Sequence, residues 1–294
     1  FKQIMAVSRK LQYQILAEHN MLDAIHFQEI DQIKKTDVTV VYQGVSGAYS
    51  QSAMFQYFGK QIKHYSVHTW DDAMQEVSSG RADYAVLPIE NSSAGMVGDV
   101  CDLLVKYDNT IVDECYLKVE HALMGLQDAS IEQIQTVYSH PQGFMQCADY
   151  LEAHKEWETI SLNNTALSAQ TVLEQNDPSK AAIASELAAE LYGLKVLEHG
   201  VNDEKDNTTR FLVIASKKIY RKDAKKLSIC LEIAHESGAL YQTLSHIIYN
   251  DLNMTKIESR PIPDKAWEYR FFIDMEGNLS DSSVQNALRG MKEE

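Results

Sequence analysis

Four hydrogen-bonding side chains stand directly before an apolar run late in the chain. They are Asn207, Thr208, Thr209 and Arg210, and the run extends from Phe211 to Ala215. The run is short, β-branched and bounded by charge, so it predicts a buried strand. Open α/β sheets place ligand sites at the mouths of such strands. Two hydroxyls and a bidentate guanidinium could bind carboxylates and contact a hydroxyl leaving group, although this segment alone also fits a polar loop.

Three further polar turns follow predicted strands. The turns cover residues 43–50, 90–95 and 139–143, after strands at 38–42, 84–89 and 136–138. Each turn leads into a predicted helix, and this repetition is typical of α/β units with parallel strands. We therefore expect the turns to collect at one edge. The glycines of the first turn also expose backbone N–H groups, which suits an anion.

His140 lies in the third of these turns. It precedes Pro141, a residue that suits the first position of a helix. The imidazole is therefore either a general acid or a polar group at a helix N-terminus, and the sequence leaves both interpretations open.

The composition excludes several classes of function. A formal net charge of −15 argues against nucleic-acid and anionic membrane surfaces, and no signal peptide or spanning apolar run occurs. The four cysteines are far apart and the ten histidines form no H-E-x-x-H pattern. We expect reduced core thiols, no metal, no cofactor and a cytoplasmic location. An anionic substrate would need a locally positive site.

The two ends of the chain add separate segments. Residues 1–27 predict a helix whose apolar stripe is interrupted by Ser8 and Gln12, which are either tolerated at a packing edge or part of a ligand site. The pattern after residue 227 predicts β-α-β-β-α, one strand short of a ferredoxin-like βαββαβ unit. Because the sequence begins at Phe1 rather than Met and stops before that strand, we expect both ends to be cut short.

The turns, taken together, resemble one family, the prephenate dehydratases, and in particular its bifunctional chorismate mutase–prephenate dehydratase branch. The matching segments are Gly44–Ser50, Pro88–Ser92, Ser139–Gln142 and Asn207–Phe211. The resemblance implies an α/β fold with a two-lobed dehydratase domain like a periplasmic binding protein. It also implies a ferredoxin-like ACT domain that lacks its last strand, and one preceding helix of an AroQ-type chorismate mutase. Ser8 and Gln12 resemble substrate-contacting residues of that helix, which alone should not be active.

These segments set the expected domain boundaries. The mutase helix would cover residues 1–30, the dehydratase domain 38–216 and the ACT domain 227–294. Within the dehydratase domain we expect one lobe at 38–112 and 195–216, and the other at 113–194. The active site would lie in the cleft between them.

The implied reaction is the decarboxylating dehydration of prephenate to phenylpyruvate, which needs no cofactor. Thr209 would donate a hydrogen bond to the leaving hydroxyl and Arg210 would bind a carboxylate. Asn91, Ser92 and Gln142 are the other predicted catalytic residues. The predicted substrate-binding residues are Ser139, His140, Thr208, Phe211, Gly47, Ala48, Tyr49 and Ser50. Arogenate is an alternative substrate, and a non-catalytic two-lobed binder of an aromatic acid is an alternative function.

The resemblance also implies feedback regulation by phenylalanine, bound across the interface of a homodimer or tetramer. The predicted effector residues are Gly238, Ala239, Leu240, Glu258, Ser259, Arg260 and Pro261. The free N–H groups at the start of the helix after Gly238 suit an amino-acid carboxylate. Tyr241 departs from the family pattern, in which Val is more usual.

Overall fold

The computed structural model describes residues 8, 11–12, 15 and 26–293. The chain divides into two compact units, a large unit (34–216) and a terminal unit (1–33 and 217–294). Most of the predicted helix 1–27 lies outside the described residues. The backbone at Ser8 and Gln12 is helical, and both side chains are exposed.

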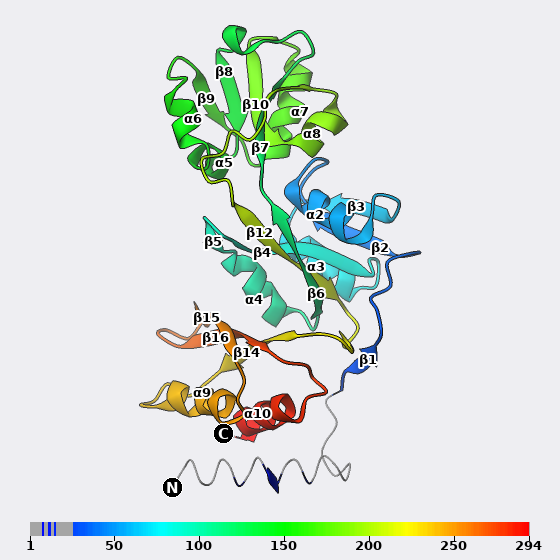
Figure 1. The fold of residues 1–294 in the computed structure, drawn as a ribbon, viewed down its shortest axis with the longest axis vertical. Helices are drawn as coiled ribbons and strands as arrows, with labels where there is room; N and C mark the ends of the chain where they lie inside the picture. The colour runs from blue at the N-terminus through cyan, green and yellow to red at the C-terminus, as the bar shows by residue number, and fades with distance from the viewer. Residues whose placement is uncertain (1–7, 9–10, 13–14, 16–25, 294) are drawn as a thin grey trace. The chain divides into compact units, whose positions relative to one another are not determined.

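The large unit contains two sheets, and the first is six-stranded (Figure 1). Its main path runs β3 (Lys63–Val67), β2 (Thr39–Gln43), β4 (Tyr84–Asn91), β12 (Thr208–Ala215) and β6 (Thr110–Lys118), with β5 (Gly95–Met96) beside β4. Helices α2 (Tyr49–Phe58), α3 (Trp70–Ser78) and α4 (Gly98–Lys106) connect these strands. A capping box formed by Thr69 and Asp72 begins α3, where it satisfies two free backbone donors.

The second sheet has five strands. Its order is β11 (Lys195–Glu198), β7 (His121–Gly125), β10 (Lys180–Ser185), β8 (Thr136–Ser139) and β9 (Glu158–Ser161). The accompanying helices are α5 (Pro141–Met145), α6 (Ala148–Glu152), α7 (Thr165–Gln175) and α8 (Glu186–Tyr192), and η1 (Ile131–Gln133) is a 3-10 turn. Ala182 and Ala184 of β10 are fully buried in one core cluster with α7, and their small side chains let that helix pack closely against the strand. We call the first sheet with its helices lobe 1 and the second lobe 2.

The expected lobe boundaries are corrected by these sheets. The apolar stretch 111–126 breaks after Lys118 into β6 of lobe 1 and β7 of lobe 2. The strand at 195–198 pairs with β7 and therefore belongs to lobe 2 rather than lobe 1. The chain thus passes from lobe 1 to lobe 2 near residue 119 and returns to lobe 1 between residues 199 and 207.

The position of β12 decides the geometry of the site. The expectation of parallel strands holds for β2 with β3 and β4, and for β8 with β9 and β10. The expectation did not extend to β12, which returns from lobe 2 and inserts antiparallel between β4 and β6. The first residues of β12 therefore lie beside the last residues of β4.

The terminal unit confirms the predicted order β-α-β-β-α. Its elements are β14 (Lys226–Glu232), α9 (Ala239–Tyr249), β15 (Met254–Pro261), β16 (Tyr269–Glu276) and α10 (Ser282–Glu293). The strands form an antiparallel sheet in the order β14-β16-β15, and Ile247, Ile273 and Met275 form its buried core. A short parallel pair joins β1 (Gln28–Ile30) to β13 (Ile219–Arg221).

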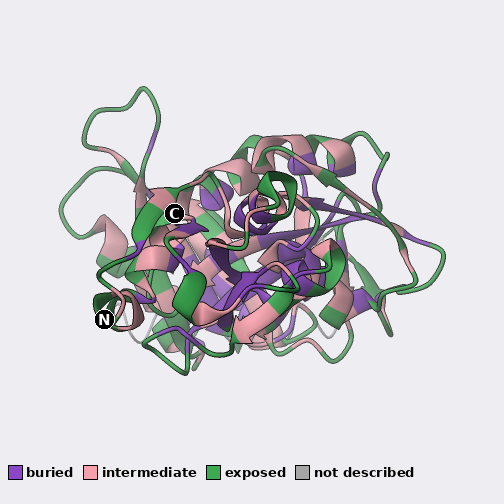
Figure 2. Ribbon diagram, turned by 90° about the horizontal axis from the view of Figure 1, so that it is seen from above, coloured by how far each residue is buried: buried purple, intermediate pink, exposed green. Residues whose placement is uncertain are grey.

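Burial follows the sheets of the large unit. In Figure 2 the buried residues concentrate on the strands, and the exposed residues lie on loops and outer helix faces. No helix in the described part of the chain combines the length and the apolar character needed to cross a membrane.

Candidate active site

Thr209 and Asn91 face each other across β12 and β4. They are register partners, and the amide Nδ2 of Asn91 donates to Thr209 Oγ1 at 2.8 Å. Thr209 is 9% exposed. Since its oxygen accepts from Asn91, its own hydrogen is free to donate, and that hydrogen has no acceptor among the residues that the structure describes. The pair therefore presents one oriented hydroxyl donor.

The turn after β4 fixes the orientation of the Asn91 amide. Asn91 Oδ1 accepts from the backbone N–H of Ser93 at 3.1 Å, from Ser93 Oγ at 2.9 Å and from the backbone N–H of Ala94 at 2.9 Å. A carbonyl oxygen must face these donors, so the amide cannot be flipped. Asn91 Nδ2 is therefore a donor toward β12.

Ser92 and Thr208 connect the ends of the same two strands by two hydrogen bonds. Ser92 N donates to the Thr208 carbonyl at 2.9 Å, and Thr208 N donates to Ser92 Oγ at 3.0 Å. Thr208 Oγ1 donates to the carbonyl of Asp206 at 3.1 Å. Both predicted side chains thus lie beside Thr209, where they hold the backbone that carries it.

Lobe 2 contributes residues from the start of α5. His140 caps this helix, since its Nδ1 accepts from the backbone N–H of Gln142 at 3.1 Å, and burial lowers the pKa of its imidazole. This contact supports the interpretation of His140 as a polar group at a helix N-terminus. Ser139 is fully buried and donates to the Ile183 carbonyl at 2.8 Å, whereas Gln142 is half-buried.

A hydrogen-bonded chain that the sequence did not reveal connects the two lobes. His121 Nε2 lies 2.8 Å from Gln146 Oε1, and Gln146 Nε2 donates to Ser93 Oγ at 3.2 Å. On its other side, His121 Nδ1 lies 2.9 Å from Tyr49 Oη. His121 is 2% exposed, and burial lowers its pKa. Gln146 follows α5 and thereby ties that helix to the turn that orients Asn91.

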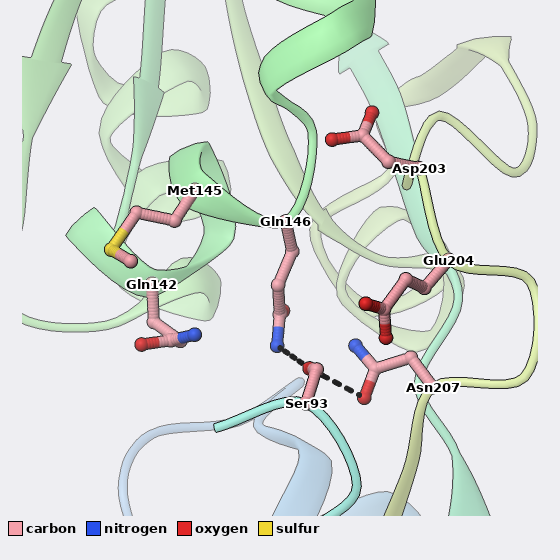
Figure 3. A pocket seen from close by; sticks show the side chains of 7 residues that line it. All are labelled: Ser93, Gln142, Met145, Gln146, Asp203, Glu204 and Asn207. Carbon is pink, nitrogen blue, oxygen red and sulfur yellow. Dashed lines mark hydrogen bonds between the residues drawn. The ribbon is translucent and has the colours of Figure 1, made fainter.

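A pocket of about 210 Å³ lies at this contact between the lobes (Figure 3). It is lined by Ser93 of lobe 1, by residues of α5 and its end, and by the segment that leads into β12. The lining residues are Ser93, Gln142, Met145, Gln146, Asp203, Glu204 and Asn207. Two of them, Asp203 and Glu204, are carboxylates, and none is Lys or Arg. The locally positive site expected for an anion is therefore not found in this lining, so neutral donors must bind any acidic group there.

Tyr49 is the residue of the glycine-bearing turn that reaches the interlobe chain, while Ser46 and Gly47 contact α8. Gly47 donates its N–H to Gln51 Oε1 at 2.7 Å and accepts from Ser185 Oγ at 2.7 Å, while Ala48 N donates to the Val45 carbonyl. These two backbone N–H groups, predicted to bind an anion, are thus occupied within the fold. Ser50, in the first turn of α2, is 7% exposed.

Arg210 and Phe211 are buried inside lobe 1. Arg210 Nε donates to Glu114 Oε2 at 2.6 Å, Nη1 lies 3.9 Å from Glu90 Oε2, and the residue is 8% exposed. Successive side chains of a strand point to opposite faces, so Arg210 is directed away from the Thr209 side of β12. Phe211 is 2% exposed and part of the core. The prediction that Arg210 binds a carboxylate of the substrate is not supported by this arrangement.

The predicted effector residues lie in the terminal unit. Gly238 is the N-cap of α9 with φ +88° and no side-chain cap, and Ala239 and Leu240 begin the helix. Glu258, Ser259, Arg260 and Pro261 end β15. Both segments are thus where the sequence predicted them, at a helix N-terminus and a strand end.

Sequence reasoning identified Thr209, Asn91 and Ser92, which the structure brings together where β4 ends and β12 begins, and Gln142, which lines the pocket. It missed His121, Gln146 and the role of Asn207. Asn207 is the first residue of the polar cluster 207–210 that the sequence analysis singled out, so its position in the sequence pointed to it. A single histidine inside the apolar strand 121–125 gave none.

Comparisons with known proteins agree with this arrangement. The family model for prephenate dehydratase matches residues 40–219. The bifunctional chorismate mutase/prephenate dehydratase of Escherichia coli K12 is 34% identical over 288 residues, covering 96% of this chain and 75% of that protein. The Aquifex aeolicus protein of the same name is 36% identical over 257 residues, covering 87% and 70%.

A solved structure is also similar. It is the prephenate dehydratase of Arthrobacter aurescens in complex with L-Phe, with a TM-score of 0.80 and 28% identity, and the match covers 87% of this chain and 86% of that one. The family model spans more than half of the chain, and the Escherichia coli relative aligns with nearly all of it. This chain therefore belongs to the prephenate dehydratase family.

Proposed function

We propose that this chain converts prephenate to phenylpyruvate, carbon dioxide and water, with Thr209 donating a hydrogen bond to the leaving hydroxyl. The observation that carries the assignment of Thr209 is the 2.8 Å bond from Asn91 Nδ2 to Thr209 Oγ1. Because Asn91 cannot flip, that bond leaves the hydroxyl hydrogen of Thr209 free to donate. Family membership supplies the reaction.

The chemistry asks little of the protein beyond orientation. The C–O bond to the ring hydroxyl and the C–C bond to the ring carboxylate both break, and the electron pair of the C–C bond completes the aromatic ring. The departing hydroxide takes up one proton to become water. A threonine hydroxyl is a poor acid, so Thr209 stabilises the developing charge by a hydrogen bond rather than by prior proton transfer.

Gln142 and Asn91 complete the proposed site from opposite lobes. Gln142 lines the pocket from α5, while Asn91 orients Thr209 from β4. Ser92 and Thr208 hold the two strands in register beside them. Substrate is thereby held between lobes, which supplies the orientation that the reaction needs.

The activity test compares two substrates. Purified chain is incubated with prephenate, and phenylpyruvate is followed by its ultraviolet absorption. Arogenate, tested in parallel, is followed by phenylalanine release. Turnover of prephenate at the higher kcat/KM supports the proposal, whereas binding of either acid without turnover makes the chain a non-catalytic binder.

The terminal unit fits an ACT domain that binds phenylalanine. Its β-α-β-β-α order matches that fold without its last strand, and the uncapped N-terminus of α9 at Gly238 suits a carboxylate. The similar Arthrobacter aurescens protein was solved with L-Phe, which adds support. We expect a homodimer or tetramer in the cytoplasm. Calorimetry with phenylalanine tests the effector site, and absence of binding to a chain with a complete ACT domain would refute it.

A mutase remnant at the N-terminus is also part of this proposal. The name of the Escherichia coli relative includes chorismate mutase, and this chain covers 75% of that protein. Ser8 and Gln12 would be its substrate-contacting residues, with no mutase activity from this helix alone. A chorismate turnover assay on the purified chain should therefore give no prephenate.

A further inference from the structure

His121 lies buried at the point where the chain enters lobe 2. It is the first residue of β7, its backbone N–H donates to Asn202 Oδ1 at 3.1 Å, and its carbonyl accepts from Val201 N at 2.9 Å. Val201 and Asn202 belong to the segment that returns to lobe 1. The imidazole is 2% exposed and packs edge-on against the Tyr49 ring, with 5.5 Å between the ring centroids. The backbone and the ring of His121 are therefore both held in place.

The hydroxyl of Ser93 determines the direction of the Gln146 amide. Ser93 Oγ lies 2.9 Å from Asn91 Oδ1 and 3.5 Å from Asn207 Oδ1, and both of these oxygens are acceptors. Because one hydroxyl hydrogen cannot also bond to a third oxygen, Gln146 presents its Nε2 to Ser93, at 3.2 Å. The other amide atom of Gln146, Oε1, then faces His121 (Figure 3).

The Gln146 amide in turn fixes which nitrogen of His121 carries the hydrogen. Gln146 Oε1 lies 2.8 Å from His121 Nε2 and can only accept, so Nε2 is the protonated nitrogen. Nδ1 of the neutral ring is then an acceptor, and the Tyr49 hydroxyl lies 2.9 Å from it. That hydroxyl also lies 2.9 Å from the Glu120 carbonyl, so its single hydrogen is shared by two acceptors. Burial lowers the pKa of His121, which keeps the ring neutral above pH 6.5.

Every hydrogen bond from His121 to Thr209 therefore points the same way. The donors, in order, are His121 Nε2, Gln146 Nε2, Ser93 Oγ and Asn91 Nδ2. In such a chain each bond polarises the next and strengthens it. The other tautomer would face Gln146 with a bare Nε2, and an amide that turned over to donate to it would lose its bond to Ser93.

We infer that His121 is a positioning residue, whose Nε2–H holds Gln146 in the direction that bonds α5 of lobe 2 to the Ser93 turn of lobe 1. This inference rests on the proposed dehydration of prephenate. Gln142, which lines the pocket, lies one helical turn before Gln146, and its carbonyl accepts from Gln146 N at 3.0 Å. The bond to Ser93 thus holds Gln142 at a fixed distance from the turn that orients Asn91, and the orientation of the substrate depends on that distance.

Two amide substitutions at position 121 separate the donor from the ring. His121→Gln keeps an N–H near the position of Nε2 and can still donate to Gln146, while the shorter side chain of His121→Asn cannot reach it. We expect kcat for prephenate to fall about 10-fold or more in His121→Asn with KM changed less than about threefold, because the substrate still binds but is held less accurately. His121→Gln should stay within about threefold of the wild-type kcat. Equal kcat values for the two variants, both shown to be folded by thermal unfolding, would overturn the inference.

A double variant tests whether His121 acts through the bond to Ser93. Ser93→Ala removes the acceptor of Gln146 Nε2. In the Ser93→Ala background, His121→Asn should lower kcat by less than about twofold, because the bond on which it acts is already absent. A further loss as large as the one in the wild-type background would show that His121 acts by another route and would overturn the inference.

The tautomer is measured on the wild-type chain, without a substitution that could unfold it. Nuclear magnetic resonance of an isotope-labelled chain above pH 6.5 gives the nitrogen shifts of His121, which are assigned by their absence from His121→Gln. They should show a protonated Nε2 and a bare Nδ1, and the reverse pattern would overturn the inference.

These results are distinguishable from a failure of the proposed function. If the wild-type chain gives no phenylpyruvate, the proposed function fails, whatever the tautomer of His121. If the wild-type chain is active and His121→Asn turns over prephenate at the rate of His121→Gln, only the role of His121 fails.

Discussion

Asn91 donates its amide hydrogen to Thr209 from the neighbouring strand, at 2.8 Å, although 118 residues separate the two in sequence. This contact depends on β12 running antiparallel to β4, which places the start of one strand beside the end of the other. The direction of the bond matters as much as its length. It makes Thr209 an acceptor toward Asn91 and leaves its hydroxyl hydrogen free to donate.

Reversing the polarity of Asn91 tests this contact. Asn91→Asp keeps the shape and still accepts from the backbone of Ser93 and Ala94. The new carboxylate oxygen would accept the Thr209 hydrogen, which is then lost to the substrate. We expect kcat to fall by at least about 100-fold with a normal unfolding temperature. Wild-type turnover would show that the direction of this bond is irrelevant.

Arg210→Lys distinguishes a structural from a substrate-binding role. The guanidinium is 9% exposed at its side chain and donates to Glu114, and lysine cannot reproduce the planar fork. We expect the free energy of unfolding to fall by about 2 kcal/mol, with KM for prephenate changed less than threefold. Denaturant titration and steady-state kinetics measure the two quantities. A tenfold higher KM with unchanged stability would restore the substrate role predicted from sequence.

Gly47 sets how closely lobe 1 approaches α8. A Cβ at Gly47 would lie 2.8 Å from both Cα and Cβ of Ala188, and φ there is +87°. Gly47→Ala should therefore lower the free energy of unfolding by about 2–4 kcal/mol, from overpacking and backbone strain together.

Gly59→Ala is the matched control for that substitution. Its φ is +88°, and a Cβ there meets nothing within 4 Å. It should cost only the strain, about 1 kcal/mol. Equal losses for the two variants, measured by denaturant unfolding, would show that the contact with Ala188 does not limit the approach of the lobes.

Burial of His121 predicts a pH-dependent stability. Its pKa lies below the usual 6.5 because burial disfavours the charged imidazole. Between that lowered pKa and 6.5 the unfolded chain binds more protons, so stability is present above pH 6.5 and is lost as the pH falls through the folded pKa. His121→Gln, which has no titrating group, should flatten the fall of unfolding temperature below pH 6.5. Part of the pH dependence should remain in this variant, because the pKa of His140 is also lowered. A pH dependence of the unfolding temperature equal to that of the wild type would refute the contribution of His121.

The sequence predicted the apolar part of β12 and the polar residues before it, since both are local patterns. It did not reveal that residues 208–210 belong to the strand. The strand places the side chains of Arg210 and Thr209 on opposite faces of the sheet, because successive side chains along a strand alternate. The antiparallel insertion of β12 was not predictable from periodicity, which identifies a strand without its partners. The orientation of Asn207 likewise depends on Asn91, which lies 116 residues away.

The turnover of Thr209→Val tests the central claim most directly. Valine keeps the shape of threonine and removes the hydroxyl, so the substrate should still bind while the leaving group loses its donor. We predict that kcat for phenylpyruvate formation falls about 100-fold or more with KM changed less than threefold. Turnover near the wild-type rate in a folded Thr209→Val protein would contradict the account.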